Sequence, residues 1–314
     1  MHDHDHSQGN SQQRLAIALI LTTSYMVVEF GGGILFNSLA LLADAGHMLS
    51  DVMALGLSWA AIQIGKRSAD DTHTFGFKRT EILAALFHGV ALWAIVGIIF
   101  YEAAHRFFAP EQVRGLGMLT VASVGLAVNL IMAAVLFRSR RENLNIKGAF
   151  LHVVSDALGS MGAIVAALII IMTGHNWVDP LVSVLIGILV LYASWGLVTE
   201  SVRILMEGVP TGLDIREIEA KMVQLEGVCC VYDLHVWSIT SNRHALSAHV
   251  VLAGEQDDRN RVLTELNAIL EERFHIDHTT IQLEASHEMR PTCERRFCRP
   301  GTACTEFDAS DRQV

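Results

Sequence analysis

Two pairs of ionisable side chains recur with one spacing inside apolar stretches of the chain. His47 and Asp51 form the first pair, and His152 and Asp156 form the second. A separation of four residues places both members of a pair on one face of a helix. Zinc prefers four ligands in a tetrahedron, drawn from histidine nitrogen, carboxylate oxygen and cysteine sulfur. Two such helices facing each other would offer a divalent cation two nitrogens and two oxygens, with two carboxylates to balance its charge. The alternative is a pair of interhelical hydrogen bonds that only hold helices together, although one pair would suffice for that.

The elements that carry these pairs are predicted to be membrane-spanning helices. The chain has 314 residues, of which 51% are hydrophobic and only 18% charged, and the apolar residues collect before about residue 205. A helix of about 20 apolar residues crosses a bilayer core. Six segments meet this requirement: Leu15–Phe36, Leu39–Ile64, Ile82–Phe107, Leu116–Phe137, Lys147–Thr173 and Val178–Leu197, the last continuing as helix past Arg203.

Basic residues predict the orientation of these spans. They concentrate in two loops, as Lys66, Arg67, Lys78 and Arg79, and as Arg138, Arg140, Arg141 and Lys147. The positive-inside rule therefore places both termini in the cytoplasm, with the chain in the cell inner (plasma) membrane in contact with lipid. The net charge of −10 argues against a nucleic-acid partner.

The remainder predicts a small soluble domain after Gly208-Val209-Pro210. Leu213–Leu225 and Arg259–Phe274 have helical apolar spacing, whereas Val228–Thr240, Ala245–Ala253 and Thr279–Leu283 have strand composition. The expected fold is a membrane α-helical protein with six transmembrane helices followed by a cytoplasmic ferredoxin-like αββαβ domain. We expect four parts: a His-rich N-terminus (1–13), the transmembrane domain (14–207), the metal-responsive domain (208–287) and a polar, irregular, Cys-containing tail (288–314).

Further polar residues lie within the predicted spans, where ionisable groups are costly and are functional candidates. Asp44 shares a helix face with His47 and Asp51, and could line the path or orient His47; the alternative is a residue near the helix end whose side chain snorkels toward the membrane interface. Glu29 and Asn129 could line the same cavity or form interhelical hydrogen bonds. His88 lacks an acidic residue four positions on, and is expected to be a packing histidine.

Taken with these residues, seven segments give the chain a resemblance to a known family. They are Ser38–Asp51, Thr74–Ile82, Gly148–Asp156, Trp177–Pro180, Leu205–Pro210, Asp233–Trp237 and Thr280–Glu284. The chain resembles the cation diffusion facilitators, in the zinc-transporter and cobalt–zinc–cadmium resistance branch. The resemblance implies a homodimer that exchanges metal for protons through His47, Asp51, His152 and Asp156. His47 at the first motif position resembles members that favour zinc, and ligand type leaves cadmium and cobalt open.

The resemblance also implies metal ions at the cytoplasmic domain. His249 and Glu284 match ligand positions there, and Cys293 and Cys298 of the tail could complete a zinc site. The alternative is a tail with incidental thiols. His73 matches a loop ligand of some relatives, and His278 could face that loop; the alternative is an exposed loop histidine. Cys229 and Cys230 open a strand and are expected to be packing residues.

Two rival functions are considered. An intramembrane metallohydrolase would show an HExxH motif, which the sequence lacks, so we expect a transporter rather than an enzyme. A membrane-tethered metal sensor without transport would carry its ligands in the soluble domain. Here the doubled pair lies within the helices, which favours efflux of Zn²⁺, the transported substrate and an expected structural or regulatory ion.

Overall fold

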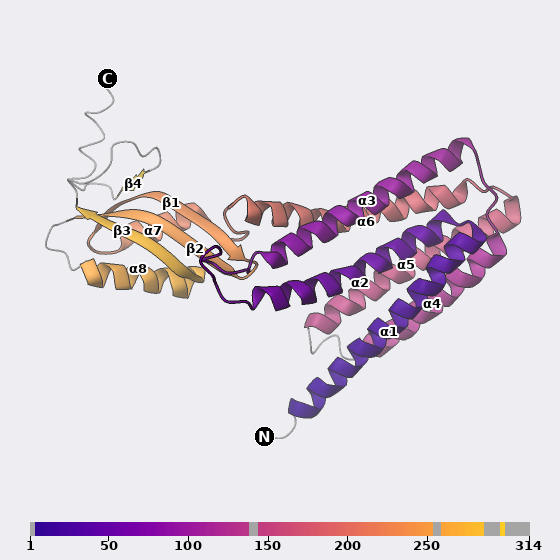
Figure 1. Ribbon diagram of the computed structural model, residues 1–314, viewed down its shortest axis with the longest axis horizontal. Coiled ribbons are helices and arrows are strands. Elements are labelled where there is room, and N and C mark those ends of the chain that lie inside the picture. The colour runs from indigo at the N-terminus through magenta and orange to yellow at the C-terminus, as the bar shows by residue number, and fades with distance from the viewer. Residues whose placement is uncertain (1–3, 138–143, 254–258, 286–295, 299–314) are drawn as a thin grey trace. The chain divides into compact units, whose positions relative to one another are not determined.

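Six helices form the first part of the computed structural model, which describes residues 4–137, 144–253, 259–285 and 296–298. Side chains are described for these residues except 4–19, 144–149, 151–152 and 296–298. The helices are α1 (His4–Phe36), α2 (Leu39–Gly65), α3 (Thr80–Phe108), α4 (Gly115–Phe137), α5 (Leu144–Thr173) and α6 (Val178–Leu205) (Figure 1). The six predicted spans are confirmed, including the extension of α6 past Arg203.

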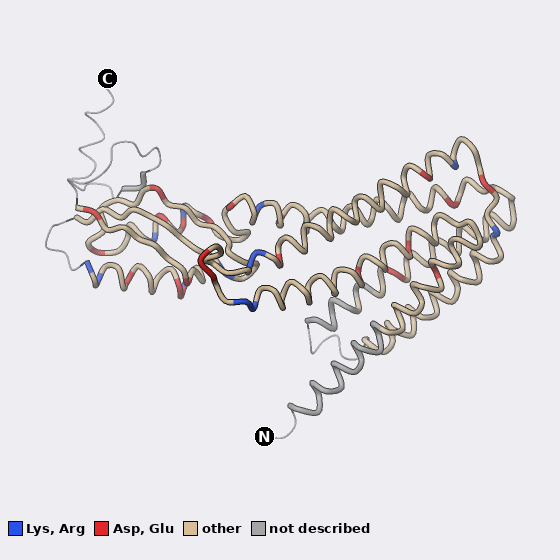
Figure 2. Tube along the Cα trace, in the orientation of Figure 1, with Lys and Arg blue, Asp and Glu red and all other residues tan. Residues whose placement is uncertain are grey.

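The outward-facing side chains of these helices suit hydrocarbon rather than water. Five of the described helices, α2 to α6, are long and apolar enough to cross a membrane, and the apolar stretch described in α1, Ile20–Phe36, is shorter. Large apolar side chains such as Ile98, Leu116 and Tyr192 are exposed by 69%, 72% and 84%. Exposed apolar surface on this scale marks contact with lipid. Figure 2 shows the same pattern, with few charges along the helices and a concentration of them in the loop that joins α2 to α3.

Helix α2 contacts two separate groups of helices. Its Ala40 and Leu41 pack with α4, α5 and the start of α6, where α5 contributes the small residues Ala163, Ala166 and Ala167. Its Leu39 and Ala43 pack instead with α3 and α6. Small residues allow close approach of helix backbones in a membrane. The face of α2 that carries His47 and Asp51 can therefore approach α5, which carries the second pair.

The C-terminal domain is a sheet with two helices packed against one face. Its elements are α7 (Ile215–Gln224), β1 (Val228–Thr240), β2 (Arg243–Leu252), α8 (Arg259–Phe274) and β3 (Ile276–Ala285). Strands β1 and β2 are antiparallel, whereas β2 and β3 are parallel and are joined by α8 as a crossover. Apolar residues of α7, α8 and the three strands form one core, which includes Met222, Leu246 and Leu266. The predicted αββαβ order is confirmed.

Two features of this domain differ from the prediction or extend it. The tail was expected to be irregular, but Arg296–Cys298 forms a short strand, β4, which pairs with β1 and gives the order β3-β2-β1-β4. The prediction was wrong because the free edge of β1 supplies the pairing that the polar tail sequence does not signal. Cys229 and Cys230 are buried, as packing residues should be, and both are also disulfide-bonded.

Candidate metal-transport site

His47 lies between two carboxylates that come from different helices. Its Nε2 atom is 3.8 Å from Oδ2 of Asp51, one turn further along α2, and 4.0 Å from Oδ1 of Asp156 on α5. The side chain of Asp156 is 3% exposed, while those of His47 and Asp51 are 21% and 34% exposed. One imidazole thus lies within about 4 Å of two carboxylates at the boundary between α2 and α5.

These separations are wider than those around a bound zinc ion. Ligands about 2.0–2.2 Å from zinc in a tetrahedron lie roughly 3.3 Å from each other. Consistent with this, no three His, Cys, Asp or Glu side chains among the described ones converge at metal-binding distance. To hold zinc, each carboxylate would have to approach His47 more closely, by roughly 0.5 Å for Asp51 and roughly 0.7 Å for Asp156. His152 lies on α5 one turn before Asp156, and its side chain is outside the described residues.

Two further carboxylates are buried beside this site. Glu29 of α1 and Asp44 of α2 are 0% and 3% exposed, and both are close enough to Asp156 to interact with it electrostatically. Tyr25, which the sequence reasoning did not single out, donates a hydrogen bond of 3.0 Å to Glu29 Oε1. Grouping carboxylates in a low-dielectric interior is costly unless a cation or protons compensate their charge. The arrangement therefore suits a path for cations.

A glycine lets Asp44 approach α5 closely. A Cβ atom at Gly159 would lie 3.0 Å from Oδ1 of Asp44, tighter than ordinary van der Waals contact. Asn129 of α4 also reaches α5, since its Nδ2 lies 3.5 Å from Oγ of Ser160. The packing histidine His88 is 3.3 Å from Oγ of Ser50 through Nδ1. Asp44 and Asn129 thus both lie against the helix that carries Asp156.

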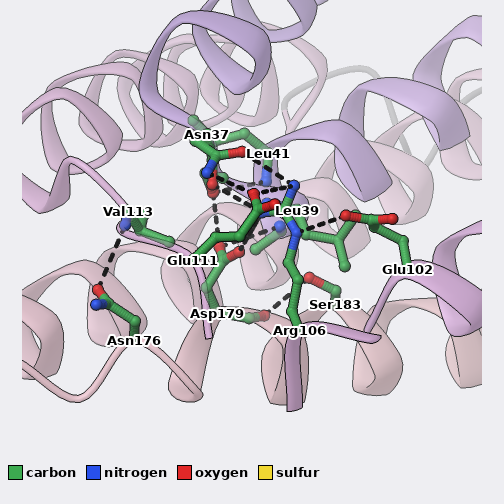
Figure 3. A network of polar contacts seen from close by, with 12 residues as sticks. Asn37, Leu39, Leu41, Glu102, Arg106, Glu111, Val113, Asn176, Asp179 and Ser183 are labelled. Atoms are coloured by element: carbon green, nitrogen blue, oxygen red, sulfur yellow. Dashed lines mark hydrogen bonds and ion pairs between the residues drawn. The ribbon is translucent and has the colours of Figure 1, made fainter. Parts of the chain in front are cut away.

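Helix α2 is anchored at its first turn by Asp179 of α6. The carboxylate accepts hydrogen bonds from Leu39 N (2.7 Å), Ala40 N (3.2 Å) and Ser38 Oγ (2.7 Å) (Figure 3). These amides belong to the first turn of α2, where backbone N–H groups have no partner within the helix and a negative charge is stabilising. Asp179 is fully buried. It therefore fixes the start of α2 to the start of α6.

Arg106 of α3 joins the same network. Its guanidinium donates to the backbone oxygen of Asn37 (2.9 Å), to Asn37 Oδ1 (3.0 Å) and to Glu102 Oε1 (2.8 Å). It also lies 3.5 Å from Glu111 and 4.0 Å from Asp179. Figure 3 shows these contacts converging on the turn between α1 and α2. Sequence reasoning missed this network, although an aspartate within a span is a recognisable signal.

A second polar cluster lies on the sheet face of the C-terminal domain opposite the helices. Glu284 of β3 is 3% exposed and receives hydrogen bonds from His249 Nδ1 (2.7 Å), Gln282 (2.8 Å) and the Tyr232 hydroxyl. His249 Nε2 is 3.9 Å from Oδ2 of Asp233, a residue with a φ of 51° at an irregularity of β1. The structure thus brings His249 and Glu284 together and adds Asp233, which the sequence reasoning did not include.

Comparison with known proteins identifies the family. Residues 15–206 match the model for the cation efflux transmembrane domain, and residues 210–286 match the cation efflux protein cytoplasmic domain. The chain belongs to the cation diffusion facilitator family. It is therefore a multi-pass membrane protein with a cytoplasmic C-terminal domain, and a divalent-cation efflux transporter rather than an enzyme.

Relatives of this facilitator match it over nearly their whole length. It is 42% identical over 310 residues to the cadmium, cobalt and zinc/H(+)-K(+) antiporter of Bacillus velezensis, covering 95% of this chain and 97% of the relative. It is 42% identical to the metal cation efflux system protein CzcD of Cupriavidus metallidurans, covering 100% and 96%. It is 40% identical to the zinc transporter ZitB of Escherichia coli, covering 93% and 95%. A solved structure, the metal-bound C-terminal domain of the CzcD transporter from Cuprividus metallidurans, is 38% identical, with a TM-score of 0.22, over 23% of this chain and 99% of that one.

The remaining predicted metal ligands belong to the loop between α2 and α3, to β3 and to the C-terminal tail. His73 contacts Oδ1 of Asp70 at 3.2 Å, while His278 packs edge-on against Phe75 of the same loop, with ring centroids 5.5 Å apart. Hydrogen bonds from Thr72 and from the His73 amide lower the pKa of Asp70 to about 2. Cys293 lies outside the described residues. Cys298 ends β4, where its backbone pairs with Cys230, and its side chain is outside the described residues.

Proposed function

We propose that this protein exports zinc from the cytoplasm in exchange for protons, and that His47, Asp51, His152 and Asp156 hold the ion in transit. The observation that carries the proposal is the position of His47, 3.8 and 4.0 Å from carboxylates of two different helices within the membrane. A sensor without transport would not need such a group at this depth. The zinc in the names of the relatives from Bacillus velezensis and Escherichia coli supports the same substrate, with cadmium and cobalt as competitors.

The ligand chemistry supports coupling to protons. Imidazole and carboxylate groups bind a metal through the same atoms that bind protons, so zinc and protons compete for the site. If the site opens alternately to each side of the inner membrane, protons displace zinc on the more acidic outer side. Zinc displaces protons on the cytoplasmic side, where both termini lie. The Bacillus velezensis relative, which is named as an antiporter with protons and potassium, supports an antiport mechanism.

Zinc flux into inverted vesicles tests this proposal. Acidifying the vesicle lumen should increase zinc uptake, and the lumen should become more alkaline as zinc enters. His47→Ala and Asp156→Asn should each abolish uptake. His105→Ala is the control, because His105 is also a histidine of a membrane-spanning helix but is exposed in the last turn of α3 and should retain most of the flux. Zinc uptake that does not depend on the pH gradient would refute the exchange mechanism. Zinc uptake that persists in Asp156→Asn would refute the assignment of the site.

The cytoplasmic domain is proposed to dimerise and to bind regulatory zinc. His249 and Glu284 already contact each other at 2.7 Å, and Asp233 lies 3.9 Å from the other imidazole nitrogen. A cation there would replace the His249–Glu284 hydrogen bond and could recruit Cys293, Cys298 or groups of a second copy. His73 and His278 remain candidates for a loop site. Zinc titration of a Glu284→Gln variant of the full chain, compared with Glu272→Gln on the exposed face of α8, should show the loss of one binding event in the first variant only.

A further inference from the structure

A large cavity opens beside the loop that joins α2 to α3. Its lining includes His73, the candidate of the loop site, but none of the proposed ligands of the transport site or of the His249–Glu284 cluster. It has a volume of about 710 Å³, within the range typical of small-molecule sites. The loop contributes Thr74 and Lys78, and the sheet contributes Trp237 and Ser247. His235 of β1 pairs in register with Ser247 of β2, so the sheet residues belong to the face opposite the helix-covered core.

The polar groups lining this cavity are mostly donors. Lysine ammonium and indole N–H groups can only donate hydrogen bonds, and hydroxyls can donate as well as accept. Within the described part of the chain, the side chains of Lys78, Trp237, Thr74 and Ser247 form no hydrogen bond or ion pair with another residue. Lys78 is nevertheless half-buried. A ligand that satisfies this lining must therefore bring several acceptor atoms and negative charge.

The acidic side chain of the lining is already engaged. Glu207 forms an ion pair with Arg79 at 3.3 Å. Asp233, which does not line the cavity, lies 3.1 Å from the lining residue His235. Two permanent cations, Lys78 and Arg79, thus face one carboxylate in the lining. Lys78 is the cation without a counterion among the described residues.

The position of the loop in the chain places these donors at the depth of lipid phosphates. Lys66 directly follows α2, and Lys78 lies two residues before the start of α3, both of which are membrane spans. The cytoplasmic leaflet carries anionic lipids, and basic pockets at the cytoplasmic ends of spans bind their head groups. A phosphate group offers the acceptor oxygens and the charge that the lining lacks.

We propose that this cavity binds the phosphate group of an anion, with Lys78 as counterion and Thr74, Ser247 and Trp237 as neutral donors. An anionic phospholipid head group and free inorganic phosphate carry the same chemistry, and the experiment below separates them. The proposal concerns neither the transport site nor zinc in the cytoplasmic domain, and its failure would leave both intact.

The test compares the full-length protein with Lys78→Gln and Lys66→Gln in lipid nanodiscs. Both lysines belong to the same loop and have the same charge, but only Lys78 lines the cavity. Native mass spectrometry would count phosphatidylglycerol retained from mixed phosphatidylglycerol–phosphatidylcholine discs. Titration of inorganic phosphate into phosphatidylcholine discs, followed by ³¹P NMR, would measure the free anion.

Loss of one charge-assisted hydrogen bond should weaken binding about tenfold in Lys78→Gln, and Lys66→Gln should match the parent protein. Ser247→Ala, which changes no charge, should weaken binding severalfold. It is the second test variant, to be used if Lys78→Gln folds poorly. A loss in the phosphatidylglycerol arm supports the lipid source, and a loss in the phosphate arm supports the free anion. Equal binding by Lys78→Gln and Lys66→Gln in both arms, or no binding by the parent protein in either, would overturn the proposal.

Discussion

Replacing Gly159 by alanine should disturb Asp44, whereas the same change at Gly162 should not. In a helix interior alanine is favoured over glycine by roughly 0.5–1 kcal/mol. At Gly162 the new Cβ would meet Val182 Cγ1 at 3.6 Å, an ordinary contact, so the full gain is expected. At Gly159 it would lie 3.0 Å from the Asp44 carboxylate, which must withdraw. Forcing extra volume into a packed interior costs about 1–3 kcal/mol. After the gain of roughly 0.5–1 kcal/mol from alanine is subtracted, Gly159→Ala should destabilise by roughly 0–2.5 kcal/mol.

The assay pairs stability with transport in the same preparations. Thermal unfolding of the detergent-solubilised full chain should show Gly162→Ala melting at or above the parent temperature and Gly159→Ala below it. Zinc flux should be close to normal in Gly162→Ala and reduced severalfold in Gly159→Ala, because Asp44 interacts with Asp156. Equal stability and equal flux in the two variants would show that Asp44 does not press against α5 at this point, and the buried-carboxylate arrangement would be wrong.

Three further predictions concern the anchoring network, the tyrosine and the soluble domain. Asp179→Asn should lower the free energy of unfolding by about 1.5–3 kcal/mol, since the carboxylate's hydrogen bonds to the start of α2 lose their charge; an unchanged melting temperature would contradict the anchoring role. Gly125→Ala should displace Tyr25, against which an added Cβ would clash, and should lower both melting temperature and flux, whereas Gly97→Ala has open space and should not. Burial lowers the pKa of His244 below its usual 6.5, so the unfolded chain takes up that proton first and stability should fall as the pH drops below about 6.5. His244→Gln should flatten this dependence in pH-resolved thermal melts, and an unchanged slope would contradict it.

Elements with strong periodicity were predictable from the sequence because the membrane and the sheet each impose a simple pattern. A span must be apolar over about 20 residues, and α2 to α6 can be recognised in the sequence by this property. The four-residue spacing of His47 and Asp51 also fixes their common face without any knowledge of the fold. Strand β4 could not be predicted, because three residues within a polar tail become a strand only where β1 offers an edge.

The contacts between helices required the structure. Tyr25 bonds to a residue only 4 positions away in the sequence. Arg106 and Asp179 bond to residues 69 and 140 positions away, and such long sequence separations cannot be anticipated from local spacing. Nothing in the sequence around Arg106 indicates that its guanidinium is held by the backbone oxygen of Asn37. The same holds for Asp233, whose approach to His249 depends on an irregularity of β1.

The two ends of the spans differ in a way that bears on how an efflux protein can move. The turn between α1 and α2, the end of α3 and the start of α6 meet at Arg106 and Asp179. Because α6 leads into the cytoplasmic domain, these ends lie at the opposite, outer side. Breaking buried charged contacts by pulling partners apart costs several kcal/mol, so the outer ends of these helices should shift as one group. His47 lies on α2, about two turns from this anchor, while Asp156 lies on α5, which contributes none of the contacts that hold Arg106 and Asp179 among the described residues. A displacement of the anchored group relative to α5 would then separate or join the two halves of the proposed transport site while leaving the anchor intact.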